Sequence, residues 1–209
     1  MPKIRLFIAS PSDVATERAK VDKVVETLKP TADHLDLTLE IVKWEDAVPD
    51  MGRPQQVIFD QLKPTEWDLF IGILWHRFGT PTGGKDETGR KFKSGTEEEF
   101  HAAYTLWKKN DRPRMMMYRC KRDLPIDKID IKQYQRVDKF FSEFNATKGK
   151  HTGLYKEFTT AEDFERKLTR DLQKVFIAYA NHLSSGSCRI GERAKQVENC
   201  PCTDFPSRS

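Results

Sequence analysis

The chain has 209 residues, of which 37% are hydrophobic and 33% are charged, and it contains 13 Phe and 4 Trp. This apolar content is enough for the core of one large domain and excludes a wholly disordered chain. Basic residues exceed acidic ones by only 36 to 32, and the two signs are interleaved, so a dedicated nucleic-acid-binding protein is not expected.

The sequence contains no signal for a membrane, a disulfide framework or a metal. No apolar run approaches the roughly 20 residues that span a bilayer, and residues 1–10 lack the apolar stretch of a signal peptide. Three of the four cysteines, Cys188, Cys200 and Cys202, fall near the end of the chain without zinc-site spacing. We therefore expect a reduced, cytoplasmic location, no membrane partner and no metal site.

Strand and helix patterns alternate along residues 1–183, which we interpret as one domain. Short apolar runs predict buried strands at 4–9, 37–44, 67–75, 114–119 and 154–158, with 67–75 in the centre. Amphipathic spacing predicts helices from residue 14 to just before Pro30, from Pro54, at 95–108, at 134–144 and at 161–183. Residues 184–209 are polar and aperiodic, and we expect a disordered tail.

This alternation predicts a flavodoxin-like α/β fold, with a parallel sheet of about five strands in the order 2-1-3-4-5 and helices on both faces. Such sheets bind ligands where the strand order reverses, between the carboxyl ends of the first and third strands. These ends are residues 10–13 and 75–79, and a Gly- and Pro-rich loop at 76–93 leaves the second of them. An unstructured connection of that length is usually functional, so the sequence predicts a ligand site here.

Residues 94–103 (SGTEEEFHAA) allow two interpretations. Ser94 with Glu97, and Thr96 with Glu99, have the spacing of a capping box, and acidic side chains in a first helical turn complement the helix dipole. In that case the glutamates only start a helix. Alternatively, a carboxylate at the rim of the crevice stabilises the oxocarbenium-like state through which a glycosidic bond breaks.

The spacing of Gly95, Thr96, Glu99 and Ala103 resembles the motif of nucleoside 2-deoxyribosyltransferases, whose glutamate attacks the anomeric carbon of the sugar. Toll/interleukin-1 receptor (TIR) domains likewise carry a glutamate that supports NAD+ cleavage on a helix beyond a central strand. The chain looks most like a TIR-like domain family of unknown function, often found in front of NACHT or other STAND-type NTPase modules. The matching stretches are 7–14 with Glu17 and Arg18, 44–45, 68–73, 77–82 and 94–100.

The resemblance implies that Glu99 is the catalytic carboxylate, with Glu98 one residue away as a second candidate. The candidate substrate-binding residues lie at the strand ends and the helix start, and are Ser10, Ser12, Asp13, Glu45, Trp75, Arg77, Gly79 and Thr96. Several have an equally simple structural explanation. Asp13 fits a helix N-cap, and Trp75 fits the core. Glu45 fits a solvated strand end, and Arg77 fits a solvated charge on a loop.

The predicted function is therefore that of a nucleotide-sugar N-glycosidase, cleaving NAD+ to nicotinamide in a signalling or defence setting. NAD+ is the substrate in this prediction, no cofactor is needed, and a second copy or a STAND/NACHT-type protein is the expected partner. The alternative is a non-catalytic self-association or protein-interaction module that uses the loop at 77–82 as its contact surface. A third candidate reaction, deoxyribosyl transfer between bases, uses the same glutamate.

Overall fold

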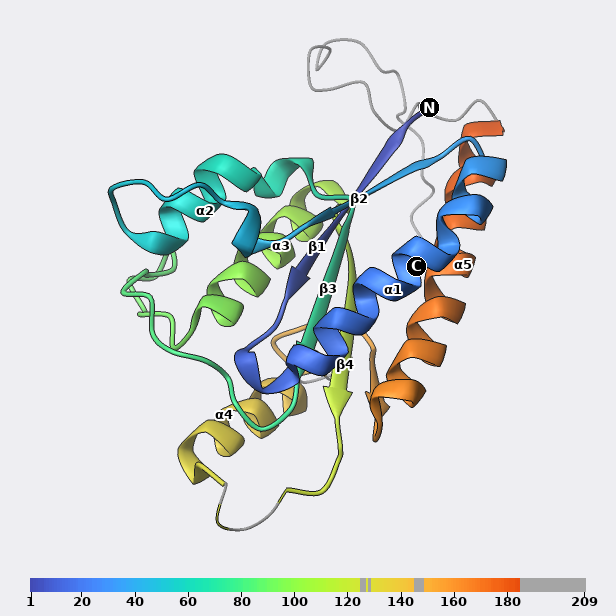
Figure 1. The fold of residues 1–209 in the computed structure, drawn as a ribbon. Helices are drawn as coiled ribbons and strands as arrows, with labels where there is room; N and C mark the ends of the chain where they lie inside the picture. Colours follow the sequence, from blue (N-terminus) through green and yellow to red (C-terminus); the bar gives the residue numbers. More distant parts are fainter. Residues whose placement is uncertain (125–126, 128, 145–148, 185–209) are drawn as a thin grey trace, which may run out of the picture.

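The computed structural model describes residues 1–124, 127, 129–144 and 149–184 (Figure 1). Its strands form one sheet in the order β2-β1-β3-β4-β5, and each of the described strand pairs is parallel. This confirms the predicted flavodoxin-like α/β fold and its strand order. The strands are β1 (Lys3–Ala9), β2 (Thr38–Val42), β3 (Leu69–Leu74), β4 (Arg114–Cys120) and β5 (Tyr155–Phe158).

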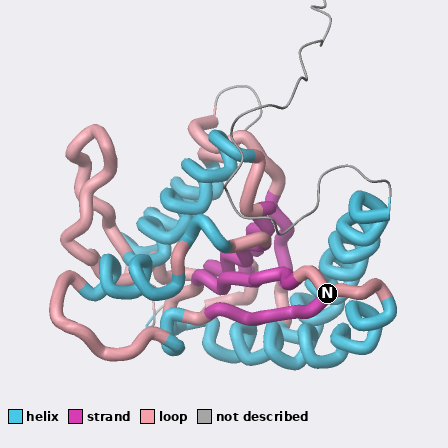
Figure 2. The backbone as a smooth tube through the Cα atoms, turned by 90° about the horizontal axis from the view of Figure 1, so that it is seen from above, coloured by secondary structure: helices cyan, strands magenta, loops and turns pink. Residues whose placement is uncertain are grey.

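Helices cover both faces of the sheet. Helices α1 (Ala15–His34) and α5 (Ala161–Ser184) pack against one face, and Figure 1 shows them side by side. The other face carries α2 (Pro54–Leu62), α3 (Gly95–Asn110) and α4 (Ile131–Ser142). Viewed from above, the strands run between these two helical layers (Figure 2).

The central strand β3 divides its side chains between two hydrophobic cores. All six of its residues are buried, which explains why this segment is a continuous apolar run in the sequence. Ile71 and Ile73 pack in the core under α1 and α5, whereas Phe70 and Leu74 pack in the core under α2, α3 and α4. Burial on both faces fixes the position of this strand and therefore of its carboxyl end.

Helix α1 extends beyond the end that the sequence predicts. We expected it to stop before Pro30, but it continues to His34 with Pro30 inside it. The last turn is held by its packing, because Ala32 is fully buried and Leu35 N donates to the carbonyl oxygens of Ala32 and Thr31. These contacts offset the hydrogen bond that Pro30 cannot donate.

The loop at residues 76–93 is more ordered than expected. Lys85 and Lys91 form an isolated antiparallel bridge across it. The Asp86 carboxylate accepts hydrogen bonds from Thr88 N at 3.0 Å and Arg90 N at 2.9 Å, which closes a turn between the two sides of the bridge. The Asp86 carboxylate thus adds to the backbone hydrogen bonds of this turn, in which Asp86 N donates to Arg90 O and Gly89 N donates to Asp86 O, both at 2.9 Å.

The end of α5 lies one residue inside the predicted tail. Ser184 is its last residue, and residues 185–209, on which the prediction of a disordered tail falls, lie outside the described residues. None of the described helices combines the length and the apolar character needed to cross a membrane.

Candidate active site

The carboxyl ends of β1 and β3 lie next to each other, because Ala9 is paired with Gly72. The first turns of α2 and α3 meet over this edge, where Gln55 of α2 contacts Glu99 of α3. The sheet therefore brings together the two strand ends that the sequence singles out, and two helices close one side of them (Figure 1).

Glu99 is a buried carboxyl group held by one amide. Its residue is only 6% exposed, and its Oε1 accepts a hydrogen bond from Gln55 Nε2 at 3.1 Å. Burial raises the pKa of Glu99 to about 8. The Gln55 hydrogen bond and the positive charge of Arg18 lower this pKa, while Glu98 and Glu45 raise it further. Desolvation outweighs the other influences, so the carboxyl group holds its proton at neutral pH.

Gln55 was not predicted from the sequence. It follows Pro54, which starts α2, and its side chain is buried although it is polar. Gly95 makes room for it, since a Cβ atom at position 95 would lie 3.0 Å from Gln55 Oε1. The Pro at the helix start was visible in the sequence, but which partner Gln55 meets depends on the packing of α2 against α3.

Glu98 has a different environment and holds the loop. Arg53 Nη1 lies 2.7 Å from Glu98 Oε1 and 2.9 Å from Oε2, and the Thr82 hydroxyl donates to Oε2. A Cβ atom at Gly84 would lie 2.6 Å from both Glu98 oxygens. Glu98 therefore ties α3 to the start of α2 and to the loop, and both of its oxygens are occupied.

The predicted capping boxes form only in part. Ser94 is the N-cap of α3, and its Oγ accepts from Glu97 N at 3.0 Å. A full capping box also needs the Glu97 carboxylate to accept from the backbone N–H of Ser94. This carboxylate instead accepts from Lys93 N and pairs with Arg90. The Thr96–Glu99 box does not form either, since both residues lie inside the helix and Glu99 turns to Gln55.

Arg18 joins two of the predicted site residues. Its Nε donates to Ser10 Oγ at 2.8 Å, and its Nη2 donates to the carbonyl oxygens of Ser10 at 2.8 Å and Pro11 at 3.3 Å. Its Nη1 forms an ion pair with Glu45. Arg18 thus links the ends of β1 and the segment after β2, a role that its position in the sequence does not reveal.

Asp13 is not the helix cap that one interpretation assigned to it, since α1 begins without a side-chain cap. Asp13 Oδ2 instead accepts from His76 N at 3.1 Å and Arg77 N at 2.9 Å, and so joins the start of α1 to the end of β3. Asp13 bonds there because the backbone N–H groups of His76 and Arg77 follow the end of β3 and are not used in the described sheet. Asp13 Oδ1 is buried and has no hydrogen-bond partner among the described residues.

The remaining predicted residues are spread around this edge. The Trp75 indole donates to Arg122 O at 3.0 Å, and the Arg122 guanidinium lies 4.1 Å from the ring centroid, over one face. Gly79 has a φ of +103°, and its carbonyl oxygen accepts from Gln133. Thr96 is buried, whereas Ser12 and Arg77 are exposed. Trp75 therefore already stacks on a cation of the protein itself.

One protein family matches most of the chain. Its pattern covers residues 5–173, and its description is a domain of unknown function (DUF4062). The chain belongs to this family. No curated protein matches the chain.

Two solved structures are similar to this DUF4062 domain. Translation elongation factor SelB from Methanococcus maripaludis, in its apo form, is 13% identical, with a TM-score of 0.41 over 86% of this chain and 35% of that chain. The FMN-dependent NADH-azoreductase from Bacillus anthracis str. Ames Ancestor, in complex with FMN, is 12% identical, with a TM-score of 0.36 over 87% of this chain and 100% of that chain. The DUF4062 chain spans about a third of the SelB chain.

The site of this DUF4062 domain contains two adjacent carboxyl groups with different partners. Glu98 faces the guanidinium of Arg53, and Glu99 faces the uncharged amide of Gln55. A carboxyl group that is shielded from water at a sheet edge can bind a hydroxyl group or exchange a proton. Once the carboxyl group is ionised, it can also stabilise a cation. Among the described residues, no group of three His, Cys, Asp or Glu is placed to hold a metal ion.

Proposed function

We propose that this domain hydrolyses the N-glycosidic bond of a nucleotide sugar, with NAD+ as the substrate and Glu99 as the catalytic residue. The observation that carries the proposal is a buried carboxyl group, oriented by Gln55, at the edge where sheets of this order bind ligands. The resemblance of residues 94–103 to deoxyribosyltransferase and TIR motifs supports the same residue.

Hydrolysis breaks the bond between the anomeric carbon of the ribose and the nicotinamide nitrogen. The bonding electron pair leaves with nicotinamide, which becomes neutral, and the ribose carbon becomes oxocarbenium-like. Water then adds to that carbon and releases a proton, so the products are nicotinamide, ADP-ribose and H+. An ionised Glu99 carboxylate stabilises the developing cation, and its exclusion from water strengthens this attraction.

Glu99 must lose its proton before it acts in this way. Since burial raises its pKa to about 8, the carboxyl group of the free protein is mostly neutral at pH 7. The cationic nicotinamide ring favours the ionised carboxylate when it binds nearby. We therefore expect kcat/KM for NAD+ to increase as the pH rises toward 8 and to level off above it.

Two side chains at the strand ends suit the rest of the nucleotide. Asp13 Oδ1, which has no hydrogen-bond partner in the described part of the chain, is an acceptor for a ribose hydroxyl group. The exposed guanidinium of Arg77 follows β3 and suits a diphosphate, because its planar fork binds two oxygens at once. In this proposal Ser10 and Glu45, held by Arg18, shape the floor of the site.

The resemblance to TIR-like domains also supports a setting for this activity. It suggests a cytoplasmic signalling or defence role, with a second copy of the domain or a STAND/NACHT-type protein as the partner. NAD+ enters as a substrate and no further cofactor is invoked. Enzymes of the TIR type commonly complete their site across a contact between subunits, so clustering of the protein belongs in the test.

The test is nicotinamide release from NAD+ by the full chain, measured by chromatography with and without antibody-induced clustering of an N-terminal tag. Wild type is expected to release nicotinamide and ADP-ribose, and Glu99→Gln to reduce the rate by at least about 100-fold. Glu97→Gln is the matched control, because Glu97 lies in the same turn but pairs with Arg90, and it is expected to remain active.

An inert wild-type protein under both conditions, or a Glu99→Gln variant as active as Glu97→Gln, would overturn the proposal. A base and a nucleoside supplied together separate hydrolysis from transfer, since transfer produces a new nucleoside instead of a free sugar.

The alternative, a non-catalytic interaction module, is supported by the anchored loop. The Thr82 hydroxyl is bound to Glu98, which holds the exposed Thr80 and Pro81 in a fixed conformation suited to a contact surface. In that case Glu99→Gln leaves self-association intact, and substitution of Arg77 or Pro81 disrupts it. Sedimentation of the three variants distinguishes this outcome from catalysis.

A further inference from the structure

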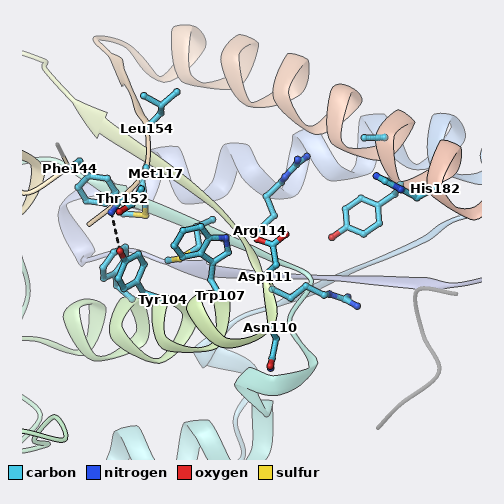
Figure 3. Close-up of a pocket in the computed structure, with 16 residues that line it drawn as sticks. Tyr104, Trp107, Asn110, Asp111, Arg114, Met117, Phe144, Thr152, Leu154 and His182 are labelled. Atoms are coloured by element: carbon cyan, nitrogen blue, oxygen red, sulfur yellow. Dashed lines mark hydrogen bonds between the residues drawn. The ribbon is translucent and has the colours of Figure 1, made fainter. Parts of the chain in front are cut away.

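A pocket of about 690 Å³ lies at the amino end of β4, away from the edge that holds Glu99. Helix α3 contributes Tyr104 and Trp107, whose rings stack at 5.5 Å and 26°, and α5 contributes Tyr179. Figure 3 shows Arg114 between the aromatic rings of α3 and His182 of α5. This volume is in the range of pockets that hold small molecules, and five of the lining residues are Phe, Tyr or Trp.

The backbone of β4 is open on the pocket side. Arg114 N donates to Asp68 O at 2.9 Å and Lys121 N donates to Phe158 O at 2.7 Å, so even-numbered residues of β4 face β3 and odd-numbered ones face β5. Strand β5 begins opposite Met117. In the described part of the chain, no strand therefore pairs with the N–H and C=O groups of Met115, which lines the pocket.

The opening is only one residue long, which excludes the addition of a whole peptide strand. On one side of Met115, Pro113 has no N–H group to donate. On the other side, Met117 is already paired with Tyr155. A single adjacent donor and acceptor remain, and these match the edge of a planar heterocycle that presents one acceptor beside one donor, as the Watson–Crick edge of a purine does.

One arginine of the lining is available to an anionic ligand. Arg112 is paired with Asp68, and among the described residues no carboxylate forms an ion pair with Arg114. Asp111 is the one acidic side chain among the lining residues. Arg114 thus offers a guanidinium group beside the aromatic walls, in a position to bind a phosphate group.

We propose that this pocket binds a purine nucleotide, with the base against Trp107 and Tyr104 and paired with the Met115 backbone, and the phosphate on Arg114. Stacking and the pair of backbone hydrogen bonds hold the base, and the guanidinium selects nucleotides over nucleosides. The site lies apart from Glu99, so this inference does not depend on the proposed glycosidase activity.

The test is titration calorimetry of AMP and of adenosine against the full chain, in a Glu99→Gln background that prevents turnover. We expect saturable binding of one AMP per chain. Arg114→Gln is expected to weaken AMP binding at least tenfold and adenosine binding less than about twofold, because only AMP contacts the guanidinium. Met115→Pro, which removes an N–H group that no described strand uses, is expected to weaken both ligands about tenfold.

Arg170→Gln, on the exposed surface of α5 two turns before the pocket, is the matched control and is expected to bind AMP as the parent does. Absence of saturable AMP binding at millimolar concentration would overturn the inference. Binding that Arg114→Gln and Met115→Pro leave unchanged would overturn it too, since the ligand would then occupy another place. Circular dichroism of each variant establishes that it is folded.

Discussion

Glu98 and Glu99 are neighbours in the sequence and both are buried, but they meet different partners. Glu98 lies against the guanidinium of Arg53, whereas Glu99 accepts only from the amide of Gln55 among the described residues. An amide has no charge that would compensate for desolvation, so burial sets the pKa of Glu99. One peptide bond thus separates a carboxylate that anchors a loop from a carboxyl group that keeps its proton.

This difference predicts how stability depends on pH. The pKa of Glu99 is about 8 when folded and near 4.5, its ordinary value, when unfolded. Between these values the folded state binds the extra proton, so the free energy of unfolding falls with rising pH, by at most about 1.4 kcal/mol per unit. Glu99→Gln removes this dependence. The melting temperature of the variant, relative to wild type, should therefore increase from pH 5 to pH 8.

The control is Glu97→Gln, measured by the same thermal melts over the same pH series. It removes a carboxylate from the same helical turn, one that is paired with Arg90. If the difference between Glu99→Gln and wild type stays constant from pH 5 to pH 8, then the carboxyl group of Glu99 titrates normally and the account of its burial is wrong.

At the scale of single elements, the loop at 76–93 depends on how closely it approaches α3. Gly84 lies where a Cβ atom would be 2.6 Å from both oxygens of Glu98 and 2.8 Å from Arg53 Nη1. The Glu98 carboxylate and the Arg53 guanidinium already form an ion pair, and the Thr82 hydroxyl donates to the same carboxylate. The backbone can reach this position only because residue 84 has no side chain.

Gly84→Ala is therefore expected to displace the Glu98 carboxylate and release the loop. Trypsin should then cleave after Lys85, Arg90 and Lys91 at least several-fold faster than in wild type, because the bound loop resists the extended conformation that a protease needs. Limited proteolysis followed by mass spectrometry measures the rate at each bond.

Gly153→Ala is the matched control, since its Cβ atom would lie 3.8 Å from Phe144, an ordinary contact. Equal cleavage rates in the two variants would show that the loop is not held through Glu98.

The strands could be predicted from the sequence because their patterns are local. The run at 67–75 contains β3 and is buried throughout, so composition alone identifies it. The partners at the site depend on packing between distant elements. Gln55 is one of several polar residues that follow Pro54, and nothing in its neighbours indicates that it meets Glu99, 44 positions later. The interpretation of Asp13 as a helix N-cap was wrong for a related reason, since Asp13 bonds to the amides after β3 instead of those of α1.

At the scale of the whole molecule, α5 covers one face of the sheet and packs beside α1, so the last described helix contacts the first. Phe164, Leu168, Leu172 and Phe176 recur every four residues and are fully buried in the same core as β1 and α1. Tyr118 of β4 adds a hydrogen bond to Asp171 at 2.8 Å. The stability of the domain therefore depends on this last helix.

Leu168→Ala is expected to lower the free energy of unfolding by about 2–5 kcal/mol, because it removes a fully buried side chain and leaves a cavity. Urea denaturation measures the change. Ile177→Ala on the same helix is the control, since Ile177 is 51% exposed, and its effect is expected to stay below about 1 kcal/mol. Equal losses in the two variants would mean that α5 is not packed as described.

The hydroxyl group of Tyr104 holds the segment that precedes the edge strand β5. It accepts from Thr152 N at 3.0 Å, and this hydrogen bond ties the chain just before β5 to α3. Tyr104→Phe removes this hydrogen bond, so the segment before β5 loses a contact that holds it on α3, in the pocket that Met115 also lines. One hydroxyl group thus anchors the chain just before its pairing with β4 begins.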